Sequence, residues 1–464
     1  MDREVERQTE ELTQAYATGR LSRRSFVFGL LGLGISIPLA GELLAACSSS
    51  GSPTTSGTGG GGSSGGAVAG GKKQTVRFLI GPWTDNEVKY QQVIAAGYTA
   101  KNPNIKFTFQ LYDWSTGDAA MDTSLAQGAH DIYYFGEGGY AGRAAQKNGF
   151  ADLASYVNDP SWAAEKAKYL YWDRINSYGP KIMGLPICGH FEDALFTNMD
   201  MVKAAGFDET FVDSWDTFLE CVTKMTKDRV YGLGIGIQES GFGEWYQRLR
   251  SAGGSYLTED LSAPNVNTQA VVDETQKWVD IFKQGIAPPQ GTFDYNTAPD
   301  AFSGGRMAIY SSDLTIAATL QGSSKPPSFT WSILPFPPGA SSRAMFNDLG
   351  FYAMSTKMDQ DLGWDVLCWW TGGQEAAYWA DLSGTYPARS DAVAMGYGKT
   401  SAKQLEDAFG TLTKYGVGCE PFTAFDTVES QAEAQIADAY GGKISAATAV
   451  ANVEKIVNHE VFGK

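Results

Sequence analysis

Cysteine and histidine are scarce in this sequence of 464 residues, which contains five Cys and three His. None of the cysteines belongs to a C-x-x-C pair, and the histidines are isolated from one another. Structural zinc sites and iron–sulfur clusters need closer groupings. We therefore expect neither a metal ion nor another cofactor, and we expect His130 and His190 to be hydrogen-bonded rather than metal ligands.

Positive charge is also in short supply, since 36 Lys and Arg face 52 Asp and Glu, for a net charge of −16. Such a chain repels phosphate backbones, which argues against a nucleic-acid partner. Only one long apolar run exists, near the N-terminus, so a polytopic membrane protein is excluded. The whole sequence is 43% hydrophobic and 19% charged, which is the composition of a chain that is mostly folded. Its length allows two or three domains.

The first 46 residues are typical of an export signal. Arg23 and Arg24 precede a mildly apolar run over residues 26–46, which resembles a twin-arginine (Tat) signal. The run ends in Leu44-Ala45-Ala46-Cys47, similar to the lipobox of bacterial lipoproteins, in which the cysteine takes the lipid. We expect residues 1–46 to be removed after Tat or Sec export and Cys47 to anchor the chain at the outer face of the cell membrane.

Residues 47–73 contain the expected anchor and a segment of mostly Ser, Gly and Thr. Such a segment buries too little apolar surface to fold, so we expect a flexible tether.

From residue 74 the sequence alternates between strand and helix patterns. The expected strands are 75–80, 105–111 and 130–135, and the expected helices are 87–101, 116–127 and 140–148. This βαβαβ order predicts a parallel sheet, which binds ligands beyond the carboxyl ends of its strands. The loops at those ends are rich in Trp, Asp and Glu.

A second alternating region starts near Asp193. Apolar residues recur at helical spacing in 214–227 and 267–282, and the C-terminal third reads as mostly helical, ending in 444–461. Short strand patterns occupy 194–198, 306–310 and 332–334.

Three stretches together resemble the family 1 extracellular solute-binding proteins of ABC importers, the branch that includes maltose-binding proteins. The first holds G-L-P at 184–186, a strand ending in T-N at 197–198, K-A-A-G at 203–206 and S-W-D-T-F at 214–218. The second is F-S-G-G-R-M-A-I-Y at 302–310. The third joins L-P-F-P at 334–337 to G-F-Y-A-M-S at 350–355 and Y-P-A-R at 386–389.

The resemblance implies an α/β fold with two lobes, a type II periplasmic-binding fold crossed by hinge strands. We assign residues 74–187 and 313–348 to the first lobe and residues 190–312 and 350–464 to the second. Gly189 and Gly350 would lie at the crossings, where glycine gives a hinge backbone freedom, although glycine is equally common in turns. The resemblance further implies a monomer that binds a carbohydrate and delivers it to a membrane permease.

Eight residues are candidates for contacting the ligand: Trp83, Glu137, Asp193, Trp245, Asp313, Asp348, Tyr386 and Arg389. Aromatic rings stack on the apolar face of a sugar, and charged groups bind its hydroxyls. The alternatives stay open: the two tryptophans also suit a core, the acids suit exposed faces or turn caps, and Arg389 suits a surface ion pair. Trp369, Trp370 and Trp379 lie in helical sequence and are expected in the core.

Three other functions remain possible from the sequence. The protein could bind another polar solute, such as a polyamine, a peptide or a polyol phosphate. It could be a secreted glycoside-active enzyme with a pair of carboxylates such as Glu137 and Asp193. It could also be a lipoprotein that scaffolds envelope partners.

Overall fold

The computed structural model describes residues 73–83, 86–113, 116–136, 149–175, 181–235, 243–294, 296–322, 325–395 and 403–464. Gly71–Tyr98 and Pro103–Lys464 form one compact unit, while Thr99–Asn102 belong to a second. The fold and the site below are described for Gly71–Tyr98 and Pro103–Lys464. The expected helix 140–148, the tether and the export signal lie outside the described residues.

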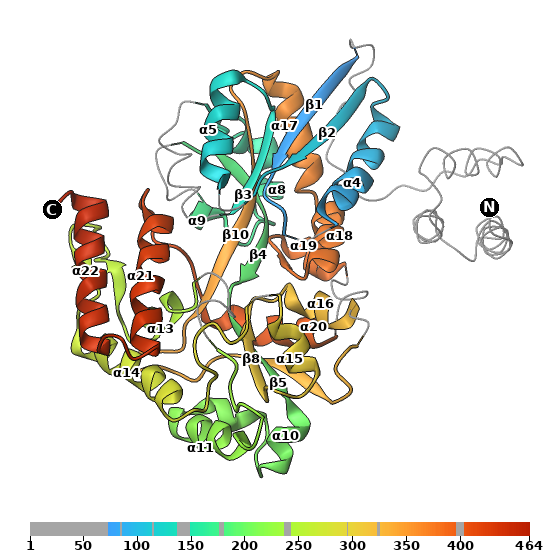
Figure 1. The fold of residues 1–464 in the computed structure, drawn as a ribbon. Helices are drawn as coiled ribbons and strands as arrows, with labels where there is room; N and C mark the ends of the chain where they lie inside the picture. The colour runs from blue at the N-terminus through green and yellow to red at the C-terminus, as the bar shows by residue number, and fades with distance from the viewer. Residues whose placement is uncertain are drawn as a thin grey trace, which may run out of the picture. The chain divides into compact units, whose positions relative to one another are not determined.

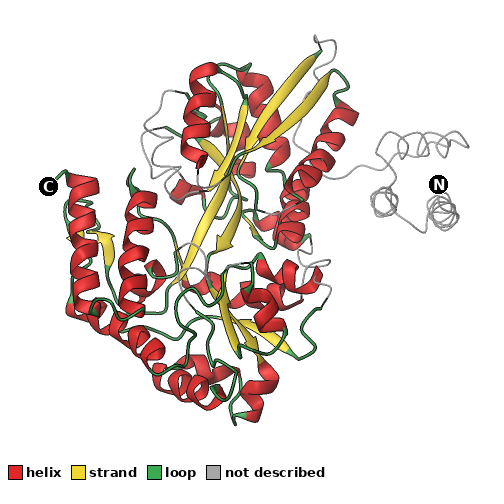
Figure 2. Cartoon of the chain, viewed as in Figure 1, coloured by secondary structure: helices red, strands yellow, loops and turns green. Residues whose placement is uncertain are grey.

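A seven-stranded sheet gathers strands from the beginning, middle and end of the chain (Figures 1 and 2). Its order is β11-β4-β10-β3-β1-β2, with β12 paired to β10. The strands are β1 (Gln74–Ile80), β2 (Ile105–Leu111), β3 (Ile132–Gly136), β4 (Gly184–Phe191), β10 (Met345–Met354), β11 (Tyr386–Pro387) and β12 (Gly416–Val417).

The pairing confirms the expected parallel unit and adds a mixed half. β1 is parallel to both β2 and β3, whereas β10 is antiparallel to β3 and β4. Because β10 lies far along the chain, the local sequence pattern did not predict its insertion beside β3.

Alternate side chains of this sheet enter two apolar clusters, as the pleat of a strand requires. Phe78, Tyr134 and Tyr352 belong to one cluster, while Leu79 and Tyr133 belong to the other. We call both clusters together the first core. Its helices are α4 (Glu87–Lys101), α5 (Gly117–Gln127), α7 (Ala154–Val157), α8 (Ala163–Lys166), α9 (Trp172–Ile175), α17 (Gln360–Trp370), α18 (Gly373–Ser383) and α19 (Ser390–Ala394), with the 3-10 turn η2 (Pro160–Trp162).

A second core surrounds a three-stranded antiparallel sheet, in the order β8-β5-β9. These strands are β5 (Ala194–Asn198), β8 (Ile309–Ser312) and β9 (Trp331–Leu334), and β6 (Ser255–Leu257) pairs separately with β7 (Pro264–Asn265). The helices of this region are α10 (Met199–Ala204), α11 (Trp215–Met225), α13 (Tyr246–Ser251), α14 (Gln269–Lys283), α15 (Ala298–Ser303), α16 (Ile316–Gly322), α20 (Lys403–Leu412), α21 (Phe425–Tyr440) and α22 (Ala446–Phe462), with η3 (Glu209–Asp213) and η4 (Thr413–Tyr415).

The expected amphipathic helices are confirmed within a few residues at α11, α14 and α22. α11 starts where the Ser214 hydroxyl accepts a hydrogen bond from the Thr217 amide at 3.2 Å. α14 starts in the same way at Thr268, because a side-chain oxygen satisfies an amide that lacks an intrahelical partner. No described helix is both long and apolar enough to cross a membrane.

Strands β4 and β10 pass from one core to the other. Leu185 of β4 packs in the first core and Phe191 in the second. On β10, Tyr352 packs in the first core and Phe346 in the second. The two strands pair antiparallel through this passage, with Asp348 opposite His190. Figure 1 shows both strands descending towards β5 and β8.

Gly350 lies inside a strand, in β10, rather than in a turn. A Cβ atom there would lie 2.5 Å from the Tyr134 hydroxyl and 2.8 Å from the Cys188 sulfur, and its φ is not positive. Glycine is therefore required for close packing rather than for an unusual backbone angle. Gly189 likewise lies inside β4, opposite Leu349 and Tyr386.

Two segments pack against a different sheet from the one that the expected lobe division implied. β9, from within 313–348, pairs with β5, and Trp331 lies 6.0 Å from the Phe196 ring. Trp370, from within 350–464, lies 4.8 Å from the Phe78 ring of β1. If the lobes follow the two cores, β9 belongs to the second lobe and α17 to the first. Apolar periodicity marks a buried face of an element but does not specify what packs against that face.

A group of buried carboxyls anchors α21 to the turn that precedes α13. Glu433 accepts hydrogen bonds from the amides of Gly243 and Glu244 at 2.9 and 3.1 Å. Glu429, one turn earlier in α21, accepts a hydrogen bond from the Tyr256 hydroxyl. Burial raises the pKa of Glu429 from 4.5 to about 8.

We expect stability to fall as the pH rises from about 5 to about 8, and Glu429→Gln to flatten this decline. The native state keeps the Glu429 proton in that interval while the unfolded state loses it, so the free energy of unfolding decreases with pH. Melting temperatures of wild type and variant across this range test the prediction. Equal slopes for the two proteins would contradict it, and Glu454→Gln, on α22, is a control.

Candidate functional site

Polar residues converge where β4 and β10 pass between the cores. His190 lies near the end of β4, Glu192 follows that strand, Asp313 follows β8, and Asp348 lies within β10. We call these four residues the crossing cluster. Strand pairing brings them together, since Asp348 lies opposite His190 and Ala194 of β5 lies opposite Ser312 of β8.

The His190 imidazole is at the centre of the crossing cluster. Its Nε2 lies 3.5 Å from Asp313 Oδ1 and 3.8 Å from Glu192 Oε2. The ring also meets Trp83 edge to face, with the ring centroids 4.5 Å apart. His190 is only 3% exposed, and its Nδ1 makes no hydrogen bond with any described residue.

Buried carboxyls repel one another in this cluster. Burial raises the pKa of Glu192 well above its usual range, and the nearby Asp348, Asp313 and Asp193 raise it further. A carboxyl group in this position keeps its proton more readily than an exposed one.

Asp348 approaches the backbone of β3 closely. A Cβ atom on Gly136, the last residue of that strand, would lie 2.6 Å from Asp348 Oδ2. The thiol of Cys419 lies 3.8 Å from Asp348 Oδ1. Glycine at position 136 therefore leaves the space that this carboxylate occupies.

Trp83 follows β1 and is positioned by a buried carboxylate of α4. Glu87 accepts hydrogen bonds from the Trp83 amide at 3.4 Å and from the Trp379 indole at 2.9 Å. Gln91 donates a third hydrogen bond to Glu87 at 2.7 Å. Burial raises the pKa of Glu87 to about 6, and these hydrogen bonds oppose a larger increase.

Asp193 lies beside the crossing cluster but is held by groups of the second core. It accepts hydrogen bonds from the Ser311 hydroxyl and from Gln247 at 3.0 Å, and Arg248 lies 3.8 Å away. Burial raises the pKa of Asp193, although Arg248 opposes the increase.

Two other predicted ligand contacts, Tyr386 and Trp245, lie away from the cluster or at its edge. Tyr386 pairs through its backbone with Gly189 on β4, and its ring lies 4.9 Å from Phe409. Trp245 is completely buried in the second core and donates a hydrogen bond to the Thr275 hydroxyl at 3.2 Å.

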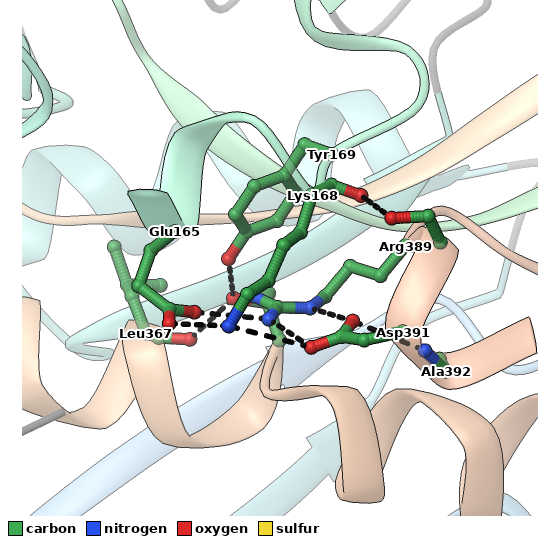
Figure 3. Close-up of polar contacts among 9 residues, drawn as sticks. Glu165, Lys168, Tyr169, Leu367, Arg389, Asp391 and Ala392 are labelled. Carbon is green, nitrogen blue, oxygen red and sulfur yellow. Dashed lines mark hydrogen bonds and ion pairs between the residues drawn. The ribbon is translucent and has the colours of Figure 1, made fainter. Parts of the chain in front are cut away.

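Arg389 belongs to a separate polar cluster (Figure 3). Its guanidinium donates hydrogen bonds to Glu165 at 3.0 Å and to Asp391 at 2.7 Å, and it lies over the Tyr169 ring. The side chain is 4% exposed and its charge is matched by these two acids. Of the remaining predicted residues, Glu137 and Cys47 lie outside the described residues.

The structure thus brings together Trp83, Asp313 and Asp348, which the sequence analysis selected, with His190 and Glu192, which it did not select. His190 and Glu192 are two positions apart around the end of β4, a spacing that puts side chains on one face of a strand. That spacing was the feature of the sequence from which the proximity of His190 and Glu192 could have been predicted. Among the described residues, no group of three or more His, Cys, Asp or Glu is arranged to hold a metal ion.

Comparison with known proteins matches this chain to one family and to many solved structures. The family of bacterial extracellular solute-binding proteins matches over residues 94–409. No curated protein sequence matches the chain significantly.

Three solved structures illustrate the similarity of fold. The ABC substrate-binding protein Lmo0181 from Listeria monocytogenes, in complex with cycloalternan, has 17% identity and a TM-score of 0.71, over 83% of this chain and 98% of that one. Maltose-bound MalE3 from T. maritima has 16% identity and a TM-score of 0.70, over 83% and 98%. The cyclic alpha-maltosyl-1,6-maltose binding protein from Arthrobacter globiformis has 18% identity and a TM-score of 0.67, over 85% and 100%.

Proposed function

Because this chain belongs to the family of bacterial extracellular solute-binding proteins, we propose that it captures a carbohydrate at the crossing cluster and delivers it to an ABC permease. The family resemblance and the α/β fold expected from the sequence are confirmed. Of the three structures described above, one is a complex with cycloalternan, one is bound to maltose, and one is of a cyclic alpha-maltosyl-1,6-maltose binding protein.

The observation that carries this proposal is the position of the crossing cluster. It lies where the two strands that contribute to both cores pair with each other, so a ligand held there contacts both parts of the fold. A ligand that makes more contacts in one arrangement of the two parts shifts the equilibrium towards that arrangement. Trp83 offers a ring to stack on a sugar, and the carboxyl groups offer acceptors for its hydroxyls.

In this proposal the protein binds and releases its solute unchanged. It acts as a monomer after export, and the lipid on Cys47 keeps it near the permease. Such a tether raises the effective concentration of the bound solute at the permease. Mass spectrometry of the mature N-terminus is the measurement that tests the lipid on Cys47.

We expect at least one saccharide in a panel of mono- and oligosaccharides to bind, and Trp83→Ala to weaken that binding about tenfold or more. The variant removes the stacking surface beside His190 while leaving Glu87 in place. Isothermal titration calorimetry on the full mature chain gives the affinities, and Trp162→Ala is the control.

Two results would contradict the proposed function. The first is the absence of binding to every saccharide, and the second is release of saccharide fragments during incubation, which would indicate an enzyme. Unchanged affinity in Trp83→Ala would place the ligand elsewhere.

A further inference from the structure

We propose that the carbohydrate carries a protonated amine and that Glu192 receives this amine. This inference rests on the proposed function and specifies its ligand class. It comes from the balance of charge around one buried imidazole.

Among the described residues, Glu192 has no Lys or Arg as an ion-pair partner. Its side chain is 13% exposed, and its one ion pair within the described ranges is with His190, at 3.8 Å. The same His190 nitrogen lies nearer to Asp313, at 3.5 Å. A single imidazole is therefore shared between two carboxyl groups, and it carries at most one positive charge.

The second observation concerns Nδ1, the other ring nitrogen of His190. Nδ1 of His190 is buried and makes no hydrogen bond with a described residue. A buried polar atom in this state is costly, and a ligand group is one way to satisfy it. Because the ring also touches Trp83, a sugar stacked on that indole would lie within reach of His190.

The surroundings of Glu192 favour a cation over a neutral hydroxyl. Besides His190, which lies 3.8 Å away, the groups that act most strongly on Glu192 are Asp193 on its own segment, Asp313 after β8, Asp348 on β10 and Glu429 on α21. Together with burial, these four acids raise the pKa of Glu192. An ammonium group offsets that repulsion, whereas a hydroxyl does not, so Glu192 would lose its proton when the amine binds.

The test compares sugars that differ at one substituent. The probes are glucosamine, glucose and N-acetylglucosamine, the corresponding chitosan, cello- and chitin oligosaccharides, maltose and spermidine. Titration calorimetry on the full mature chain, below the pKa of the sugar amine and in two buffers of different ionisation enthalpy, gives affinity and proton release together. Glu192→Gln is the test variant, and Glu274→Gln is the control because Glu274 is also largely buried but pairs with Lys277 on α14.

We expect an amine-bearing saccharide to bind about tenfold more tightly than its neutral counterparts, with net release of protons. Glu192→Gln should remove both the preference and the proton release, while Glu274→Gln behaves as wild type. Neutral sugars that bind as tightly as amines, or a preference that survives Glu192→Gln, would overturn this inference alone. Binding of spermidine only, or of no saccharide, would overturn the proposed function as well.

Discussion

Replacing Arg248 with alanine should lower the free energy of unfolding by about 3–5 kcal/mol, because it leaves buried acids without their cation. Arg248 is 2% exposed and lies on α13 in the second core. It pairs with Glu244 one turn earlier and lies 3.8 Å from Asp193. Its guanidinium also stacks 3.9 Å from the Trp278 ring centroid, so alanine removes packing as well as charge.

Urea unfolding followed by circular dichroism measures this effect, with Arg250→Ala as the matched control. Arg250 is on the same helix, but it is 32% exposed and lies 3.5 Å from Glu420. Its replacement should cost no more than about 1 kcal/mol. Similar losses for the two variants would show that burial of the Arg248 ion pair is not the source of the effect.

Replacing Trp370 with alanine should cost about 3–5 kcal/mol of stability through the cavity that it leaves in the first core. The ring is completely buried, with its centroid 4.8 Å from those of Phe78 and Phe107. Its indole nitrogen donates a hydrogen bond to Gln91 at 2.7 Å. Trp370→Phe keeps most of the ring packing and should recover much of the loss, although Gln91 then lacks a donor.

The neighbouring Trp369 supplies the control, because it is only partly buried and its indole bonds to the Ile94 carbonyl at 3.1 Å. Trp369→Ala should therefore cost less than Trp370→Ala in the same unfolding experiment. Saccharide affinity should not change in Trp370→Ala at temperatures where the variant is folded. Equal costs for the two tryptophans would contradict the assignment of Trp370 as the more deeply packed residue.

Helices α11 and α14 illustrate what local patterns predict well. Residues 214–227 and 267–282 repeat apolar side chains with the helical period, and α11 and α14 bury Phe218 and Trp278 on those faces. The same patterns placed Trp369, Trp370 and Trp379 in the core; Trp370 and Trp379 are completely buried, whereas Trp369 is only partly buried. Burial of one face is a local property, so the sequence of a single element is enough to predict it.

It was harder to predict which strands pair with each other. The pattern of β9 predicts a strand, yet only its register with β5 places Trp331 beside Phe196. β10 is buried along its whole length, and nothing in its sequence specifies insertion between β3 and β4. Contacts between distant segments depend on the whole arrangement of the chain, which a short window of sequence does not contain.

The sequence by itself determined the acidic charge, the strand and helix order, and the residue patterns that identify the family. Only the tertiary structure decided which acids share His190, because β4 and β10 must pair before Glu192, Asp313 and Asp348 meet. It also showed Arg389 matched by Glu165 and Asp391, and Trp245 enclosed in a core. Desolvation and pairing set the behaviour of each charged group, and both depend on neighbours from distant parts of the chain.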